Sequence, residues 1–148
     1  MEAVAGFPKR EVQAISLIGL AHMLSHLYWI AFAPIAPAMM GTFQISALEW
    51  GLSLGVFSVT TGLFQTPMGL VVERVGGRRV LFGGLLLTSV SIFLIGYLAS
   101  SYWMLVSLMA IAGMGNSVFH PADYSLLDAS VEKSRIGRAF SIHNFSGQ

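Results

Sequence analysis

The side chains that could do chemistry in this 148-residue chain are few, and most are histidines in apolar surroundings. His22 and His26 are four residues apart, which places both on one face of a helix. Asn116, His120 and Asp123 fall within eight residues of each other in a later apolar stretch. Because imidazole changes charge near neutral pH, such groups could carry protons or bind a polar solute. The candidates for a polar pathway are His22, His26, Gln65, Asn116, His120 and Asp123.

The same residues give weaker support to a metal site or to catalysis. A His-x-x-x-His pair can bind a transition metal, but two ligands are too few, and the Glu of the metalloprotease pattern is absent. A third ligand from His120 or Asp123 would be needed. Catalysis would require a convergent nucleophile and base, whereas the polar groups here are sparse and lie near prolines. We therefore expect no enzyme, no cofactor and no resident metal, and keep a metal-ion transporter that uses the His22 and His26 pair as an alternative.

The composition is that of a membrane protein. Hydrophobic residues make up 55% of the chain and charged residues 10%, against roughly 25% charged residues in soluble domains. The formal net charge of +1 gives none of the basic excess that a nucleic-acid partner requires. The absence of Cys excludes disulfides and thiolate metal sites. The surplus of apolar residues must face lipid or another chain, so a soluble binding module is excluded.

Long uncharged runs predict where the chain crosses the bilayer. No charged residue lies between Glu11 and Glu49, from Trp50 to Val72, or from Val80 to Ala122. A crossing takes about 20 residues, so the third run is long enough to cross twice. The sequence predicts an all-α integral membrane protein with four complete transmembrane helices and the start of a fifth, near residues 13–40, 47–72, 80–99, 102–128 and 137–148. The last is too short to cross, and we expect residues 1–148 to be an incomplete unit cut inside that helix.

The distribution of basic residues predicts the orientation. With four crossings, the N-terminus and the loops at 73–79 and 129–138 lie on one side of the membrane, and the loops at 41–46 and 100–101 on the other. The first side holds every basic residue: Lys9, Arg10, Arg74, Arg78, Arg79, Lys133, Arg135 and Arg138. Lys and Arg collect in cytoplasmic loops. We expect a multi-pass membrane protein with its N-terminus in the cytoplasm.

Prolines within the first and fourth helices suggest a transport pathway. Pro34 and Pro37 are expected to interrupt the first helix, and Pro121 to kink the fourth. Transporters built from three-helix repeats use interrupted helices at corresponding positions to form their central site. The pattern predicts a water-filled pathway lined by the six candidate residues.

An alternative stays open for each of these polar residues. Each His could hydrogen-bond a neighbouring helix and serve only to hold the bundle together. Asp123 lies near the cytoplasmic end of its helix, where Arg135 or Arg138 could pair with it, in either a structural or a gating role.

Two groups of glycines are expected to pack helices together. A row of small residues on the second helix predicts close approach of a neighbouring helix. Its members are Gly51, Gly55, Ser58, Gly62 and Gly69. Gly113 and Gly115 superficially suggest a phosphate loop, but no strand precedes them, so helix packing is expected there too.

The loop after the second helix, GLVVERVGGRR, resembles the loop motif of the major facilitator superfamily. That motif runs Gly, three residues, an acid, a base, any residue, Gly, any residue and two bases. Every position is filled, by Gly69, Glu73, Arg74, Gly76, Arg78 and Arg79. The glycine at position 76 would permit a tight turn, and the arginines would pair with carboxylates and keep the loop cytoplasmic.

Three further stretches resemble the fosmidomycin-resistance-type branch of that superfamily: AHMLSHLYWIAFAPIAPAMM, GMGNSVFHPADYSLL and RIGRAFSIHNFSGQ. The resemblance implies a twelve-helix protein of two six-helix halves. This chain would be part of the N-terminal half, and its partner would be the C-terminal half of the same protein. It also implies a substrate site between the halves, alternating access, and export of a small molecule in exchange for protons. Because that branch is bacterial, the resemblance implies the bacterial inner membrane.

The resemblance assigns roles to particular residues as well. In the superfamily the loop acid contacts the other half, which gives Glu73 a gating role. Many drug-proton antiporters carry an Arg in the fourth helix before the glycines, and none is present here, so His120 or Asp123 would replace it. A small four-helix dimeric exporter is the competing architecture.

Overall fold

The computed structural model describes residues 6–147, which fold entirely into helices and the turns that join them. The helices are α1 (Lys9–Phe43), α2 (Ala47–Val75), α3 (Gly77–Tyr97), α4 (Tyr102–Asn116), α5 (Phe119–Ser130) and α6 (Ile136–Ser146). Four segments are long and apolar enough to cross a membrane, with α4 and α5 together forming the fourth. The predicted all-α membrane class is confirmed. The predicted last residue of the fifth helix, Gln148, lies outside the described residues.

Local signals set the helix ends. At the start of α2, the Ser46 side chain accepts from the Glu49 backbone N–H while the Glu49 carboxylate accepts from the Ser46 N–H, a capping box. Ser101 caps α4 by accepting from the Met104 N–H. Only Gly76 separates α2 from α3, and its φ of 93° is one that residues with a side chain rarely adopt. The expected tight turn in the loop motif is therefore present.

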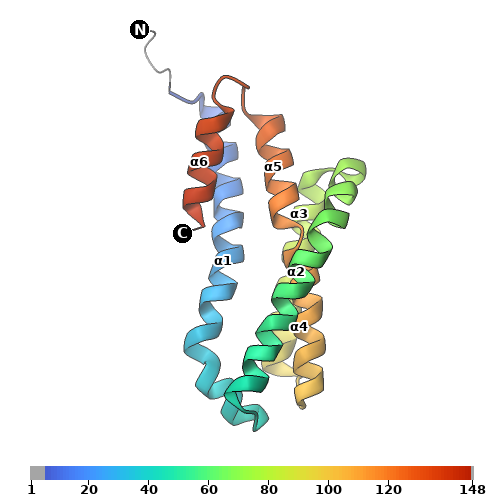
Figure 1. Ribbon diagram of the computed structural model, residues 1–148. Helices are drawn as coiled ribbons and strands as arrows, with labels where there is room; N and C mark the ends of the chain where they lie inside the picture. The colour runs from blue at the N-terminus through green and yellow to red at the C-terminus, as the bar shows by residue number, and fades with distance from the viewer. Residues whose placement is uncertain (1–5, 148) are drawn as a thin grey trace.

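The helices alternate in direction between two ends of the molecule (Figure 1). The α2–α3 and α5–α6 turns lie toward the same end as the start of α1, and the α1–α2 and α3–α4 turns lie at the other. The most extensive contacts are those of α4 with α3 and α2, while α1 packs mainly on α5 and α6. This arrangement agrees with four crossings and places all the basic loops at one end.

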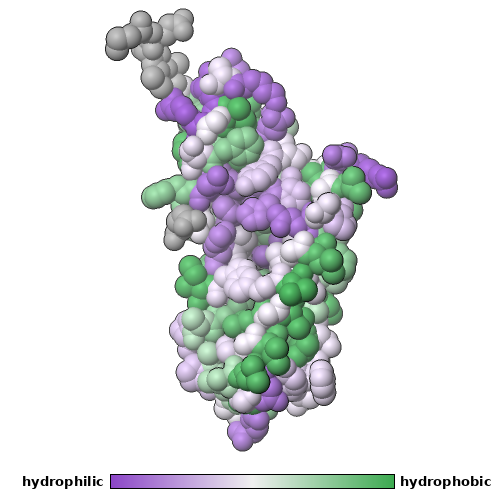
Figure 2. Space-filling view, in the orientation of Figure 1, coloured by the Kyte–Doolittle hydropathy of each residue, from purple (hydrophilic) through white to green (hydrophobic). Residues whose placement is uncertain are grey.

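The apolar surplus lies on the outside of the helices. One stripe on α3 is exposed at intervals of three or four residues, which is one face of a helix, and it consists of Phe82, Leu86, Val90, Phe93 and Tyr97. Figure 2 shows hydrophobic residues over the lower part of α2 and hydrophilic residues gathered in the upper half of the same face. The apolar stripe of α3 and the hydrophobic lower part of α2 are suited to contact with lipid.

Prolines act differently in the two helices where interruption was expected. The helix is interrupted at Ser117–Val118, between α4 and α5, although both residues keep right-handed helical dihedrals. Pro121 has no N–H to donate to the Ser117 carbonyl, and its ring crowds that oxygen. The interruption lies just before Pro121, where the sequence analysis placed a disturbance of the fourth helix. The predicted interruption of α1 is wrong, since Pro34 and Pro37 both lie inside one continuous helix. Prolines are tolerated in membrane helices when local adjustments satisfy the freed carbonyls.

Close helix packing centres on the glycines of α4 and not on those of α2. A Cβ added to Gly115 would lie 2.7 Å from the backbone N of Thr88 on α3, and one added to Gly113 would overlap the Phe57 carbonyl oxygen on α2. The expectation of helix packing at these two glycines is confirmed. The predicted close approach of a neighbouring helix to the small-residue row of α2 is wrong within residues 6–147. A Cβ added to any glycine of that row would meet nothing within 4 Å; these glycines are Gly51, Gly55, Gly62 and Gly69.

Replacing Gly113 with Ala is expected to lower the thermal unfolding temperature of the protein in detergent. The added methyl group would meet the backbone of Phe57, which cannot rotate away as a side chain could, and overpacking of this kind costs about 1–3 kcal/mol. Gly62→Ala, on the open face of α2, is the control and should leave the transition unchanged. Equal unfolding temperatures for the two variants would contradict this packing.

Candidate functional site

All four histidines of the chain meet in one cluster, the histidine cluster, formed by His22, His26, His120 and His143. His22 on α1 is central. The centroid of its ring lies 4.6 Å from that of His26, 5.5 Å from that of His120 on α5 and 4.1 Å from that of His143 on α6. His22 and His143, which are 121 positions apart in the sequence, are thus in direct contact. The break between α4 and α5 lies just before His120, and α5 contacts α1.

The hydrogen bonds of the cluster fix where protons can sit. His22 Nδ1 lies 3.0 Å from the carbonyl oxygen of His143, which can only accept, so Nδ1 is the donor. In a neutral His22 the other nitrogen, Nε2, is then an acceptor, and His26 Nε2 donates to it across 3.1 Å. Protonation of His22 would turn Nε2 into a donor and reverse this bond. The direction of this hydrogen bond therefore depends on the protonation states of both rings.

Asp123 lies beside His143 of this cluster, and both residues are fully buried. Their closest charged atoms, Oδ2 and Nε2, are 3.8 Å apart, which is too long for a hydrogen bond. Neither carboxyl oxygen and neither ring nitrogen has a hydrogen-bond partner among the described residues. The site thus contains a buried acid whose only ion-pair partner within residues 6–147 is an imidazole.

The predicted pairing of Asp123 with Arg135 or Arg138 is wrong. Arg135 instead forms a bidentate pair with Glu11 at the start of α1, with N–O distances of 2.7 and 2.9 Å, and it also contacts Glu132 at 2.6 Å. The hydrogen bond to Glu11 raises the pKa of the Arg135 guanidinium, which stays charged. The pair joins α1 to the α5–α6 turn, about two helical turns beyond Asp123.

A cavity of about 240 Å³ lies against the histidine cluster, between α1, α2, α4 and α5. Its wall contains four of the six candidate pathway residues: His26, Gln65, Asn116 and His120. The other lining residues are Ser25, Trp29, Ser58, Thr61, Gly62 and Phe119. The wall has no Asp, Glu, Lys or Arg. The other two candidates, His22 and Asp123, do not line it.

Two buried atoms near the cavity lack partners among the described residues, Asn116 Oδ1 and His120 Nδ1. Their residues both line the cavity. Buried polar atoms are normally hydrogen-bonded, so these two are available to a solute or to water.

His143 is the residue that the sequence reasoning missed. It lies in the fifth apolar segment, which was too short to cross and was therefore given no site residues. A usable signal was present, because His143 is seven residues inside the start of α6 and Asp123 is seven residues inside the end of α5. Two helices joined by a short turn place such positions at the same depth.

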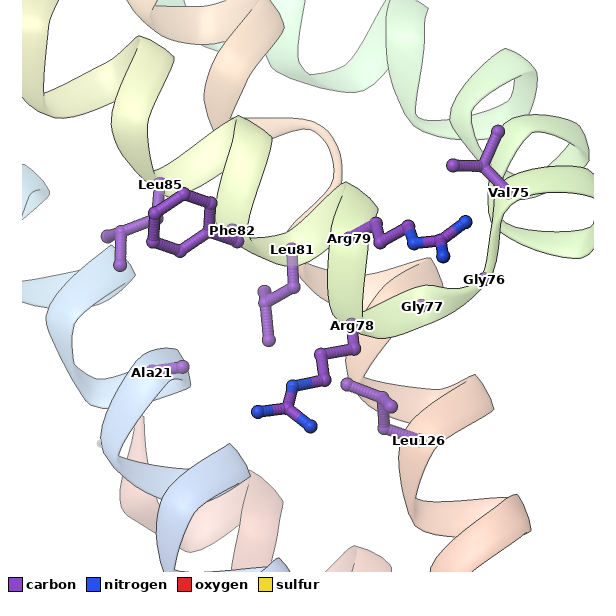
Figure 3. Close-up of a pocket in the computed structure, with 10 residues that line it drawn as sticks. All are labelled: Ala21, Val75, Gly76, Gly77, Arg78, Arg79, Leu81, Phe82, Leu85 and Leu126. Atoms are coloured by element: carbon purple, nitrogen blue, oxygen red, sulfur yellow. The ribbon is translucent and has the colours of Figure 1, made fainter.

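The loop motif forms a separate site. Gly76, Arg78 and Arg79 line a second cavity of about 860 Å³ whose other walls are apolar. Figure 3 shows Arg78 extending past Leu126 toward α1, while Arg79 points toward Val75. Of the remaining motif residues, Gly69 and Arg74 do not line this cavity, and Glu73 is exposed.

Replacing Gly147 with Ala is expected to displace the two histidines of α1. A Cβ there would lie 2.7 Å from His22 Cε1 and 2.9 Å from His26 Nε2, closer than van der Waals contact allows. The hydrogen bond between the two rings should weaken, which ¹⁵N NMR of labelled histidine detects as changed ring-nitrogen shifts. Gly137→Ala, at the open start of α6, is the control. Identical histidine spectra in both variants would contradict this packing.

Comparison with known proteins gives a consistent result. Residues 18–148 match the family model described as Major Facilitator Superfamily. The chain is 26% identical over 133 residues to the fosmidomycin resistance protein of Escherichia coli (strain K12), which covers 90% of this chain and 32% of that protein. It is 31% identical over 99 residues to the uncharacterized MFS-type transporter YfkF of Bacillus subtilis (strain 168), covering 58% and 25%.

A third relative is an animal protein. The chain is 30% identical over 111 residues to a putative inorganic phosphate cotransporter of Drosophila melanogaster, covering 72% of this chain and 21% of that protein. No solved structure matches. The chain spans between about a fifth and a third of the length of these relatives.

Proposed function

Because the chain belongs to the Major Facilitator Superfamily, a family of membrane transporters and not of enzymes, we propose that it is part of a secondary transporter that exports a small molecule in exchange for protons. The remaining helices, including a C-terminal half, complete a twelve-helix protein that works by alternating access. The observation that carries the proposal is the gathering of all four histidines and Asp123 beside one polar cavity.

The cavity wall explains how a proton and a substrate could exclude one another. It offers hydroxyl, amide and imidazole groups but no fixed charge. Protonation of His26 or His120 would add a positive charge to the wall and remove a hydrogen-bond acceptor from it. A neutral or cationic substrate that uses this acceptor would then bind only to the deprotonated site, as exchange requires.

The four histidines differ in how well they fit this role. His22 uses both ring nitrogens within the protein, toward His143 and His26, which suits a purely structural residue. His26 and His120 line the cavity instead. The proton-coupling role is therefore proposed for His26 and His120, and His22 holds the cluster together.

Nothing in the geometry favours the metal-ion alternative. In the part of the chain that the structure describes, no three His, Asp or Glu side chains are arranged to hold a metal ion. One nitrogen of His22 is also committed to a backbone carbonyl.

Transport by the complete protein in inverted membrane vesicles tests the proposal. A substrate is first found by screening small molecules for thermal stabilisation of the purified protein. With a proton gradient imposed, the vesicles should accumulate that substrate above the external concentration, and collapsing the gradient should release it. Uptake that stops at the external concentration with the gradient in place would contradict proton coupling.

The proposed orientation places the N-terminus and the basic loops in the cytoplasm of a bacterial cell. Single cysteines are clean reporters because the sequence contains none. Cysteines at Gly76 and Ser134 should react with a membrane-impermeant reagent only in inverted vesicles, and one at Gln44 only in intact cells. External labelling at position 76 would reverse the topology.

A further inference from the structure

Asp123 and the cluster residue His143 form a buried pair away from the cavity. Both residues have an exposure of 0%, neither lines the cavity, and their Oδ2 and Nε2 atoms are 3.8 Å apart. Neither side chain has a hydrogen-bond partner among the described residues. The transport role given to His26 and His120 makes no use of this pair.

Burial restricts the charge that the pair can carry. A lone carboxylate or a lone imidazolium inside a membrane protein costs several kcal/mol. Two states avoid that cost: a protonated Asp123 beside a neutral His143, or a carboxylate beside an imidazolium. Both states hold the same single titratable proton, which sits on Oδ2 in the first and on Nε2 in the second.

No fixed charge near the pair changes this balance. From α1, His22 stacks on His143, and His26 is bonded to His22. From α5, the Tyr124 ring centroid lies 5.8 Å from that of His143. The charged residues of α2 and α3 that could face α5 are all exposed, at Glu73, Arg74, Arg78 and Arg79. Arg135 in the α5–α6 turn is bound by Glu11.

We infer that Asp123 and His143 form a second proton-binding site, which holds one proton between the two side chains while it is buried and releases it when α5 and α6 open to water. On opening, the proton passes from Oδ2 or Nε2 to water and leaves a hydrated carboxylate and a neutral imidazole. On closing, a proton from water restores the neutral pair.

The position of the pair connects the cavity with one end of the bundle. Seven residues separate Asp123 from the end of α5, and seven separate His143 from the start of α6, about 10 Å along each helix. His22 lies between the pair and the cavity, stacked on His143 on one side and bonded to His26 on the other. The inference rests on the proposed function only in assigning this proton to the transport cycle.

Spectroscopy of the complete protein in lipid nanodiscs, without substrate at neutral pH, measures this proton directly. Infrared difference spectra between the wild type and Asp123→Asn report whether the carboxyl is protonated. ¹⁵N NMR of labelled histidine reports the state of His143, whose signal is assigned by its loss in His143→Gln. Asp128→Asn, an exposed acid on the same helix, is the matched control and should leave the acid carbonyl band unchanged.

The inference expects one of two patterns: a protonated carboxyl with a neutral His143, or a carboxylate with a protonated His143. A carboxylate beside a neutral imidazole, or protonation of both groups, would overturn it. In His143→Gln no imidazole can neutralise Asp123, so a full acid carbonyl band is expected, and it should vanish in the double variant with Asp123→Asn. The double variant keeps the pair uncharged, so it tests the inference even where Asp123→Asn alone fails to fold.

The two proposals fail separately. If the pair holds one proton but vesicles show no proton-driven transport, the proposed function is wrong and the proton site remains. If transport is proton-driven but the pair shows neither expected pattern, only the second proton site is wrong.

Discussion

Replacing His26 or His120 with Gln is expected to reduce proton-driven uptake into inverted vesicles to the level of vesicles without the protein. Gln keeps a polar side chain at the cavity wall but cannot titrate. Substrate–substrate exchange, which needs no net proton movement, should survive. Ser107→Ala, which removes an exposed hydroxyl of α4 that does not line the cavity, should retain both activities.

The other outcomes of this experiment are equally informative. Loss of both activities together with poor folding would assign that histidine to holding the bundle together. Unchanged proton-driven uptake in both variants would contradict the coupling role and leave the proton to Asp123 and His143, or to helices beyond this chain.

Glu73→Gln is expected to impair transport strongly by shifting the balance between inward-facing and outward-facing states. Glu73 is exposed at the α2–α3 turn, and within residues 6–147 it forms no ion pair, so its proposed partner lies in the other half of the transporter. Cysteine accessibility on the two sides of the membrane should change, while substrate affinity changes little. Asp128→Asn supplies an exposed acid outside the loop motif for comparison.

A large fall in substrate affinity with unchanged accessibility would place Glu73 in substrate binding and contradict the gating role. None of the motif residues lines the histidine-lined cavity, and Gly76, Arg78 and Arg79 line the second cavity instead. A gating effect therefore has to act through movement of the halves.

The sequence predicts the helices well because the bilayer imposes a strong local rule. A stretch without charges must span, and a Ser or Gly at its end can stop or cap it, as Ser46, Gly76 and Ser101 do. The break before Pro121 is equally local, because the missing N–H acts on a carbonyl four residues earlier.

Contacts between distant segments could not be predicted in the same way. Arg135 was considered as a partner of Asp123, which is close in the sequence. It pairs instead with Glu11, 124 residues away, and this contact depends on how α1 meets the α5–α6 turn. The same applies to the glycine row of α2. Small residues permit a neighbouring helix to approach closely, but the sequence does not indicate which helix does so.

The structure brings four of the six predicted pathway residues together, and their role in transport stays a prediction. His26, Gln65, Asn116 and His120 line one cavity, because the break between α4 and α5 brings α5 beside α1. The depth of His143 in the membrane could be inferred from its distance to the α5–α6 turn, but its stacking on His22 depends on the fold and could not.

Proton release on substrate binding to the purified complete protein tests the central claim most directly. Calorimetric titrations in buffers of different ionisation enthalpy count the protons released at constant pH. If protons and substrate exclude one another at the histidine-lined cavity, substrate binding to the wild type should release protons below neutral pH, and His26→Gln or His120→Gln should release fewer. A binding enthalpy independent of the buffer across that pH range would contradict the account.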